Sequence, residues 1–178
     1  YKRQGNTIRP ALQLLKTKPG ISSVSGFFLM EVPDCEFGDN GVFVFADCAV
    51  NPTLDSEKLA EIAGLSAESF EAFTGGTAKV AMLSFSSMGS AKSDDVTKVA
   101  DAVKIAQEKY PEVAIDGELQ LDAAIVPSVA AAKAPNSKVA GHANTLVFPS
   151  LEAGNIGYKL VQRLAKANAY LSLIHISE

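Results

Sequence analysis

The chain has 178 residues, of which 47% are hydrophobic and 20% are charged, and its formal net charge is −4 at pH 7. A chain of this length buries roughly two thirds of its unfolded surface, so a real core is possible. The length favours one domain, or one domain with attached pieces of another. The acidic balance argues against a nucleic-acid-binding surface, but it leaves room for an anionic small molecule held by local positive charge.

The sequence has two cysteines, Cys35 and Cys48, and they do not form a Cys-x-x-Cys pair. Because the apolar fraction does not require a disulfide, we expect a reduced, cytoplasmic setting. The two histidines are too few for a histidine-based metal site. No apolar stretch approaches the ~20 residues of a membrane span, and no secretory leader follows Lys2 and Arg3. The chain is expected to be soluble.

Strand-like and helix-like runs alternate along the chain, which is typical of an α/β fold. Residues 22–32 and 41–50 are rich in β-forming residues, and the turn-prone residues 38–40 lie between them. This arrangement predicts an antiparallel pair of strands. Two further short strands are expected at 79–85 and 145–148.

Three helices are expected from the spacing of apolar residues. The first ends at Gly75-Gly76, the second begins after the N-cap Ser93 and ends before Pro111, and the third covers 152–169. Their inward faces are predicted to carry Leu59, Ile62 and Ala63, then Val96, Val99, Ala100, Val103 and Ala106, then Ile156, Leu160, Val161 and Leu164.

The segment 84–93 runs from the end of a strand into the start of a helix and has the sequence Ser-Phe-Ser-Ser-Met-Gly-Ser-Ala-Lys-Ser. Free backbone N–H groups, small hydroxyl residues and Lys92 at such a junction suit an anion. The alternative is a serine-rich loop with an N-cap, because the segment is neither a Walker motif nor GxGxxG.

Three acids, Asp116, Glu118 and Asp122, follow a strand-like run. They suit a metal or a general base, but a turn with one structural hydrogen-bonding acid is the simpler interpretation. Cys35 has the acidic neighbour Glu36, which disfavours a nucleophilic thiolate.

Arg9 begins a short helix-like segment whose first turn accepts Pro10. A fixed guanidinium there can hold phosphate oxygens with two parallel hydrogen bonds, and the alternative is a solvated surface arginine. His142, between Gly141 and Ala143, is interpreted as a solvated loop histidine.

Taken in order, these segments resemble the phosphate acetyltransferase family over residues 7–170. The matching segments are 7–13, 16–20, 32–35, 45–52, 80–86, 89–93, 115–120, 122–124, 133–137, 139–141 and 154–159. The resemblance implies a two-domain α/β enzyme with the three-layer αβα architecture of the isocitrate/isopropylmalate dehydrogenase-like fold. Its active site lies in the cleft between the domains, and it forms a homodimer largely through the second domain.

The implied reaction converts acetyl-CoA and phosphate to acetyl phosphate and CoA by direct attack in a ternary complex. It needs no metal and no cofactor, since coenzyme A is a substrate. Fixed cations and pre-aimed donors bring the two anionic reactants together.

The resemblance also assigns residues and domains. Arg9 matches a family arginine that contacts the anionic substrates and is the expected catalytic residue, whereas Cys35 matches a neighbour of the site. The loop 84–93 is expected on the cleft side, with substrate contacts from Ser84, Ser86, Gly89, Ser90 and Lys92. Residues 1–20 correspond to a remnant of the first domain and the crossover, 21–170 to the second domain, and 171–178 to a tail that resembles nothing in the family and is expected to be non-native.

After Tyr170 the family continues to an Asn-Asp-Leu-Ser-Arg-Gly motif and an acidic base, and these residues are not in this sequence. The chain by itself is therefore expected to be inactive. Alternatives with the same pattern are a phosphate butyryltransferase and the acetyltransferase-like tail of a malic enzyme. In the latter case the chain would be a non-catalytic dimerisation or regulatory module.

Overall fold

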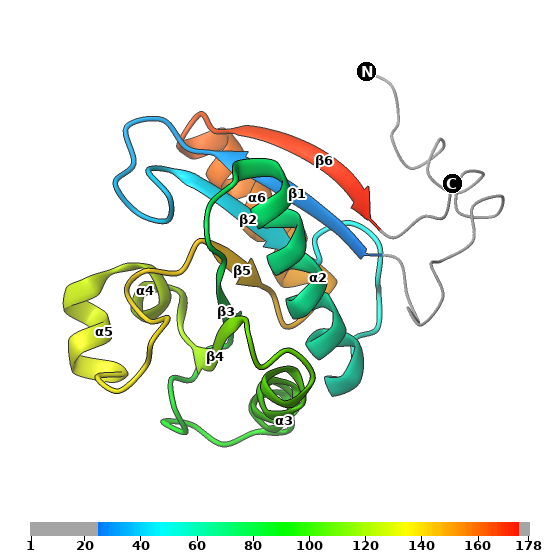
Figure 1. Cartoon of the computed structure of the whole chain (residues 1–178), viewed down its shortest axis with the longest axis vertical. Coiled ribbons are helices and arrows are strands. Elements are labelled where there is room, and N and C mark those ends of the chain that lie inside the picture. Colours follow the sequence, from blue (N-terminus) through cyan, green and yellow to red (C-terminus); the bar gives the residue numbers. More distant parts are fainter. Residues whose placement is uncertain (1–24, 175–178) are drawn as a thin grey trace, which may run out of the picture.

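The computed structural model describes residues 25–174 of the chain. These residues form a six-stranded sheet with the strand order β4-β3-β5-β2-β1-β6 and helices packed against it (Figure 1). The elements are β1 (Ser25–Glu31), β2 (Val42–Ala46), α2 (Ser56–Thr74), β3 (Lys79–Leu83), α3 (Asp94–Lys109), β4 (Ala114–Leu119), α4 (Leu121–Ile125), α5 (Pro127–Lys133), β5 (Thr145–Val147), α6 (Leu151–Leu164) and β6 (Asn168–Ile174). The fold is a mixed α/β fold, as the sequence predicts.

The first two strands form the predicted antiparallel pair, with Phe28 opposite Phe45 and Glu31 opposite Val42. Residues Gly38, Asn40 and Gly41 between them have positive φ angles of 67°, 49° and 87°, which is the left-handed region that turns require. The sheet then continues in parallel, because β5 pairs in parallel with both β2 and β3, and β3 pairs in parallel with β4.

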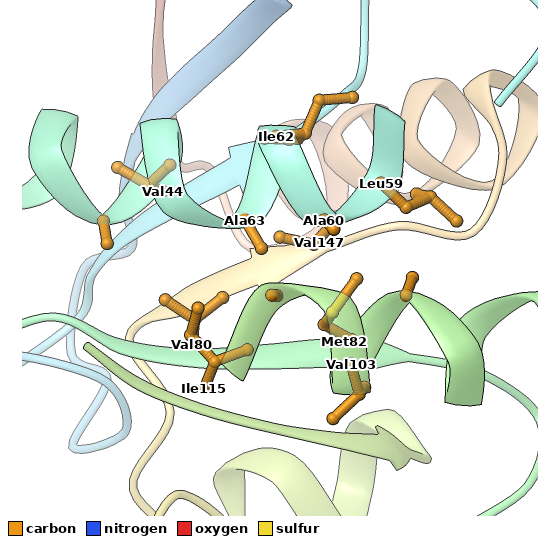
Figure 2. Packing of buried hydrophobic residues seen from close by; sticks show 14 of the residues in the cluster. Val44, Leu59, Ala60, Ile62, Ala63, Val80, Met82, Val103, Ile115 and Val147 are labelled. Atoms are coloured by element: carbon orange, nitrogen blue, oxygen red, sulfur yellow. The ribbon is translucent and has the colours of Figure 1, made fainter. Parts of the chain in front are cut away.

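Alternate residues of the central strands belong to two separate core clusters, because successive side chains of a strand point to opposite faces. Val44, Val80 and Met82 pack with α2 and α3 on one face, and Figure 2 shows this cluster around Leu59, Ile62, Ala63 and Val103. On the other face, Phe45, Ala81 and Leu83 pack with residues of α4, α5 and α6.

Two of the predicted helix boundaries are confirmed by their capping bonds. The side chain of Ser93 accepts a hydrogen bond from Val96 N–H, and it begins α3. Gly75, with φ 71°, ends α2 by donating its N–H to Glu71 O.

The prediction for the last helix is wrong in two respects. The helix α6 ends at Leu164, and Lys166, with φ 54°, begins the turn into β6. In addition, Ile156, Leu160 and Leu164 do not face inward, since their side chains are 59%, 53% and 79% exposed.

The face of α6 that contacts the sheet uses small residues instead. A Cβ atom at Gly154 would lie 2.5 Å from Asp47 O, and one at Gly157 would lie 2.9 Å from the ring of Phe148. Tyr158 of the same face stacks on Phe28, with ring centroids 4.0 Å apart. The i, i+4, i+8 apolar row is therefore the outer face of a helix that approaches the sheet through glycines.

The strand β6 runs antiparallel to β1 and brings Ile174 opposite Ser25 (Figure 1). It contains residues 171–174, and the origin of the predicted tail 171–178 stays a prediction. Arg9 and the rest of segment 1–20 lie outside the described residues. Within residues 25–174, no helix combines the length and the apolar character that crossing a bilayer requires.

Candidate functional site

The parallel strands β2, β3, β4 and β5 end at one edge of the sheet, which we call the carboxyl edge. The segments that leave it are the turn at 47–51, the loop 84–93 (the serine loop), residue Gln120 and the N-cap Ser150 of α6. In open α/β sheets, ligands bind outside the carboxyl ends of the strands. This edge is therefore the candidate site on the described part of the chain.

The serine loop is organised around an internal carboxylate, that of Glu118 in β4. Ser86 Oγ and Gly89 N–H both donate to Glu118 Oε1 at 2.7 Å, and Met88 N–H donates to the main-chain oxygen of Glu118 at 2.9 Å. The residue is only 4% exposed. The anion that this loop holds in the structure is thus part of the protein.

The hydroxyl groups of the loop bind its own backbone. Ser86 Oγ accepts from Ala91 N–H at 3.0 Å and lies 3.3 Å from Ser90 Oγ. Ser90 Oγ accepts from Ser87 N–H at 3.0 Å, and Ser84 Oγ accepts from Ser86 N–H at 3.3 Å. The structure brings the predicted residues Ser84, Ser86, Gly89 and Ser90 together, and several of their polar groups are already paired within the loop.

The outer surface of the serine loop has a different character. Phe85 is 60% exposed and Met88 is 42% exposed, although phenylalanine and methionine are usually buried. Lys92, the predicted cation, is also exposed and has no ion-pair partner among the described residues. The loop therefore presents two apolar side chains and one cation to solvent.

A second chain of polar contacts joins the loop to α4 and α5. Gln120 N–H donates to Ser87 Oγ at 3.0 Å, and Lys133 Nζ donates to Gln120 Oε1 at 2.8 Å and to Asp122 Oδ2 at 2.9 Å. The hydrogen bond from Lys133 lowers the pKa of the Asp122 carboxyl below its usual range. Beside these contacts is a hollow of about 330 Å³ lined by Met88, Asp116, Lys133, Ala134, Pro135, Asn136 and Ser137.

The three acids of this region have separate structural partners. Asp116 accepts from Gly117 N–H, Glu118 holds the serine loop, and Asp122 pairs with Lys133. Among residues 25–174, no three His, Cys, Asp or Glu side chains form a group suited to a metal ion. The simpler interpretation is confirmed for the hydrogen-bonding role of Glu118. It is wrong about the turn, because Asp116 and Glu118 lie in β4.

Cys35 lies at the opposite edge of the sheet, because the connection from β1 to β2 joins the end of an antiparallel strand to the start of a parallel one. Its thiol is half-buried, and Sγ lies 4.0 Å from Phe37 O. The neighbouring cavity of about 330 Å³ is lined by Glu36, Phe37, Gly38, Ile125, Pro127, Gly141 and the exposed His142. Cys35 and the serine loop do not meet in the described part of the chain.

The turn after β2 is held by a fully buried acid that sequence reasoning missed. Asp47 Oδ1 accepts from Ala49 N–H at 2.8 Å and Val50 N–H at 3.0 Å, and Asp47 Oδ2 accepts from Asn51 N–H at 3.0 Å and from the Asn51 side chain. An aspartate directly after a buried strand, followed by Asn-Pro, is the signal that could have indicated this turn. Burial and the adjacent Asp47 charge raise the pKa of the Cys48 thiol well above its usual range, so this cysteine is an inert core residue.

The first described residue, Ser25, lies at the carboxyl edge. Ser25 begins β1 there, and Gly26 O accepts from Cys48 N–H at 3.1 Å, just beyond the end of β2. Three strand spacings separate β1 from β3 in the sheet, which corresponds to about 14 Å between Ser25 and the start of the serine loop.

Comparison with known proteins identifies the family. The family described as Phosphate acetyl/butaryl transferase matches residues 1–174. The chain belongs to this family. A phosphate acetyltransferase of Thermoanaerobacterium thermosaccharolyticum is 63% identical over 162 residues, which cover 91% of this chain and 49% of the relative.

Solved structures of family members have the same fold. A phosphotransacetylase from Streptococcus pyogenes matches with a TM-score of 0.90 and 50% identity over 98% of this chain and 52% of its own. EutD phosphotransacetylase from Staphylococcus aureus matches with a TM-score of 0.85 and 55% identity over 99% of this chain and 54% of its own. The chain spans about half the length of the curated relatives it matches.

Proposed function

We propose that this chain is part of a phosphate acetyltransferase that converts acetyl-CoA and phosphate to acetyl phosphate and CoA in the cytoplasm. The observation that carries the proposal is the 63% identity with a phosphate acetyltransferase over 91% of the chain. The reaction takes place by direct attack in a ternary complex, without a metal or another cofactor. Since the chain spans about half of such relatives, we expect the 178-residue chain alone to be inactive.

The chain contributes the second α/β domain of a two-domain enzyme. Residues 1–20 correspond to a remnant of the first domain and the crossover, and 21–170 form a three-layer domain of the isocitrate/isopropylmalate dehydrogenase-like type. Support for the layers comes from the two core clusters, one on each face of the sheet. The cleft between the domains faces the carboxyl edge, to which the Arg9 segment is joined through Ser25.

Two anionic reactants meet in this cleft, so fixed cations contribute most to catalysis by holding the reactants together and stabilising the negative charge. Arg9 holds the oxygens of the phosphoryl group, and Lys92 of the serine loop contacts a phosphate of coenzyme A. Ser84, Ser86, Gly89 and Ser90 form the loop that presents Lys92. Cys35, at the opposite edge, is a neighbour of the active site only if the first domain reaches around the β1–β2 connection.

The test of this function is an acyl-transfer assay on the full-length protein. Formation of the CoA thioester from acetyl phosphate is expected to have a kcat/KM at least about tenfold higher than formation from butyryl phosphate, because a pocket shaped for acetyl excludes the longer chain. The control is the 178-residue chain alone, which is expected to form no thioester. Absence of thioester formation by the full-length protein, or a preference for butyryl phosphate, contradicts the proposal.

The enzyme forms a homodimer through the outer face of α6. The row Ile156, Leu160 and Leu164 places three exposed aliphatic side chains on one stripe of that helix, and such a stripe is stable in water when another apolar surface covers it. In a two-fold dimer, α6 of one copy packs against α6 of the other, so the apolar stripe of each copy covers the identical stripe of its partner.

Leu160→Glu is expected to shift the chain from dimer to monomer at micromolar concentration, because the substitution places a charge at the centre of the apolar row. Light scattering gives the mass directly. Lys104→Glu, on the exposed surface of α3, is the control and is expected to leave the dimer intact. A wild-type chain that is monomeric throughout the micromolar range contradicts this assembly.

A further inference from the structure

Glu118 is a buried charge whose compensation comes almost entirely from one loop. A carboxylate removed from water is costly unless it receives hydrogen bonds. Its Oε1 receives two of them, from the Ser86 hydroxyl and the Gly89 amide, at 2.7 Å each. Hydrogen bonds to an ionised acceptor are about twice as strong as neutral ones. The serine loop and the Glu118 carboxylate therefore stabilise each other.

This contact fixes the backbone conformation of the loop. Met88 has a φ angle of 50°, which is unfavourable for a methionine and is kept only where surrounding contacts determine it. Gly89 has a φ angle of 81°, which glycine adopts readily. Met88 N–H donates to the Glu118 main chain, and Gly89 N–H donates to its side chain. Ser86 Oγ, which donates to Glu118, also accepts a hydrogen bond from Ala91 N–H at 3.0 Å, so the position of Ala91 is fixed as well. One acid thus orders the centre of the loop.

The outer side chains of the loop depend on that backbone. Phe85, Met88 and Lys92 are exposed. Met88 also lines the hollow of about 330 Å³, together with Lys133 and Asn136. Aromatic and sulfur-containing side chains offer a surface for a flat base or a flexible alkyl chain. An exposed lysine suits a phosphate group. A flat base, a flexible chain and phosphate groups are the components of coenzyme A.

We propose that Glu118 is a positioning residue for coenzyme A, acting through the serine loop. Resting on the proposed acetyl transfer, the inference assigns the contact with the adenine or pantetheine part of the coenzyme to Phe85 and Met88, and the contact with a phosphate to Lys92. Glu118 touches no substrate, because its carboxylate is buried beneath the loop. The Glu118 carboxylate already binds the Gly89 N–H, and its negative charge repels free phosphate from this part of the loop.

Glu118→Gln tests this role, since glutamine keeps the shape and one acceptor oxygen but removes the charge. In the full-length enzyme, the KM for CoA is expected to rise about tenfold, while kcat and the KM for acetyl phosphate change less than about twofold. Glu112→Gln removes the same charge from an exposed position and is expected to change none of the three. Phe85→Ala is expected to raise the KM for CoA as Glu118→Gln does.

Amide hydrogen exchange in the 178-residue chain separates loop order from substrate binding. Glu118→Gln is expected to speed exchange at Gly89 and Ala91 by about tenfold or more, with the β3 amides unchanged. Phe85→Ala is expected to leave exchange unaltered, because it removes only an outer side chain.

The outcomes distinguish the two proposals. A wild-type full-length protein without acetyl transfer refutes the proposed function itself. An active wild type whose Glu118→Gln variant keeps a normal KM for CoA refutes the positioning role alone. A fall in kcat together with a rise in both KM values and a lower Tm also refutes the positioning role, because that pattern indicates general destabilisation.

Discussion

Replacing Arg9 with lysine is expected to lower kcat/KM of the full-length enzyme by more than about tenfold, and replacing it with glutamine is expected to lower it further. The physical reason is the planar guanidinium, which binds two phosphate oxygens with parallel hydrogen bonds. Lysine supplies the charge without this geometry, and glutamine supplies neither.

Steady-state kinetics with acetyl phosphate and CoA measure the effect. The melting temperature of Arg9→Gln is expected to stay close to that of the wild type, since the proposed role is in the substrate cleft and not in the core. Lys104→Gln removes one positive charge from an exposed pair with Asp101 and serves as the control. Normal kinetics of Arg9→Gln for both substrates would return Arg9 to the role of a solvated surface residue.

The elements that the sequence predicts well are those with local chemical signals at their ends. Ser93 has the N-cap side chain and two acids in the first turn, and Gly75 has the left-handed conformation that ends a helix. The turn at 38–40 combines three residues that accept positive φ or form turns. These signals act within a few residues, so they can be interpreted without the rest of the fold.

The outer face of α6 could not be predicted in the same way. Its i, i+4, i+8 row of aliphatic residues has the period of a buried stripe. The sheet instead takes the face with Gly154, Gly157 and Tyr158, where the absence of side chains allows the backbones to approach closely. Periodicity gives the existence of an apolar face, whereas tertiary packing decides which face meets the core.

The serine loop shows a similar division. Its sequence predicts a strand-to-helix connection, which the structure confirms between β3 and α3. The binding of an external anion by this loop stays a prediction. The sequence does not show that the donors of this loop bind Glu118, because that contact depends on the pairing of β3 with β4. Glu118 lies 29 positions after Gly89 and 32 positions after Ser86. The helices α4 and α5 and the strand β6 were missed because short alanine-rich and mixed segments carry weak periodicity.

Replacing Asp47 is expected to have the largest effect on stability. Asp47→Ala should lower the free energy of unfolding of the chain by about 3 kcal/mol or more, because three backbone N–H groups and one side-chain amide lose a charged acceptor inside the protein. Asp47→Asn should cost nearly as much. Both carboxylate oxygens accept hydrogen bonds, so the new NH₂ group must face a donor whichever way the amide is turned.

Urea unfolding followed by circular dichroism measures the difference. Asp101→Ala is the matched control, since Asp101 is half-exposed and pairs with Lys104 within one helix at 3.1 Å, an arrangement worth under about 1 kcal/mol. An Asp47→Asn chain whose free energy of unfolding lies within about 0.5 kcal/mol of the wild type would show that the turn does not depend on the acid.

Replacing Asp47 should also affect dimer assembly, because α6 packs against the turn that Asp47 holds. Gly154 of α6 lies against the main-chain oxygen of Asp47, and Asn155 Nδ2 donates to Cys48 O at 3.2 Å. A loosened turn would free the first turn of the helix that carries Ile156, Leu160 and Leu164. We therefore expect Asp47→Asn to weaken the proposed dimer at urea concentrations that leave the wild-type dimer intact, although Asp47 is fully buried and cannot contact the second copy.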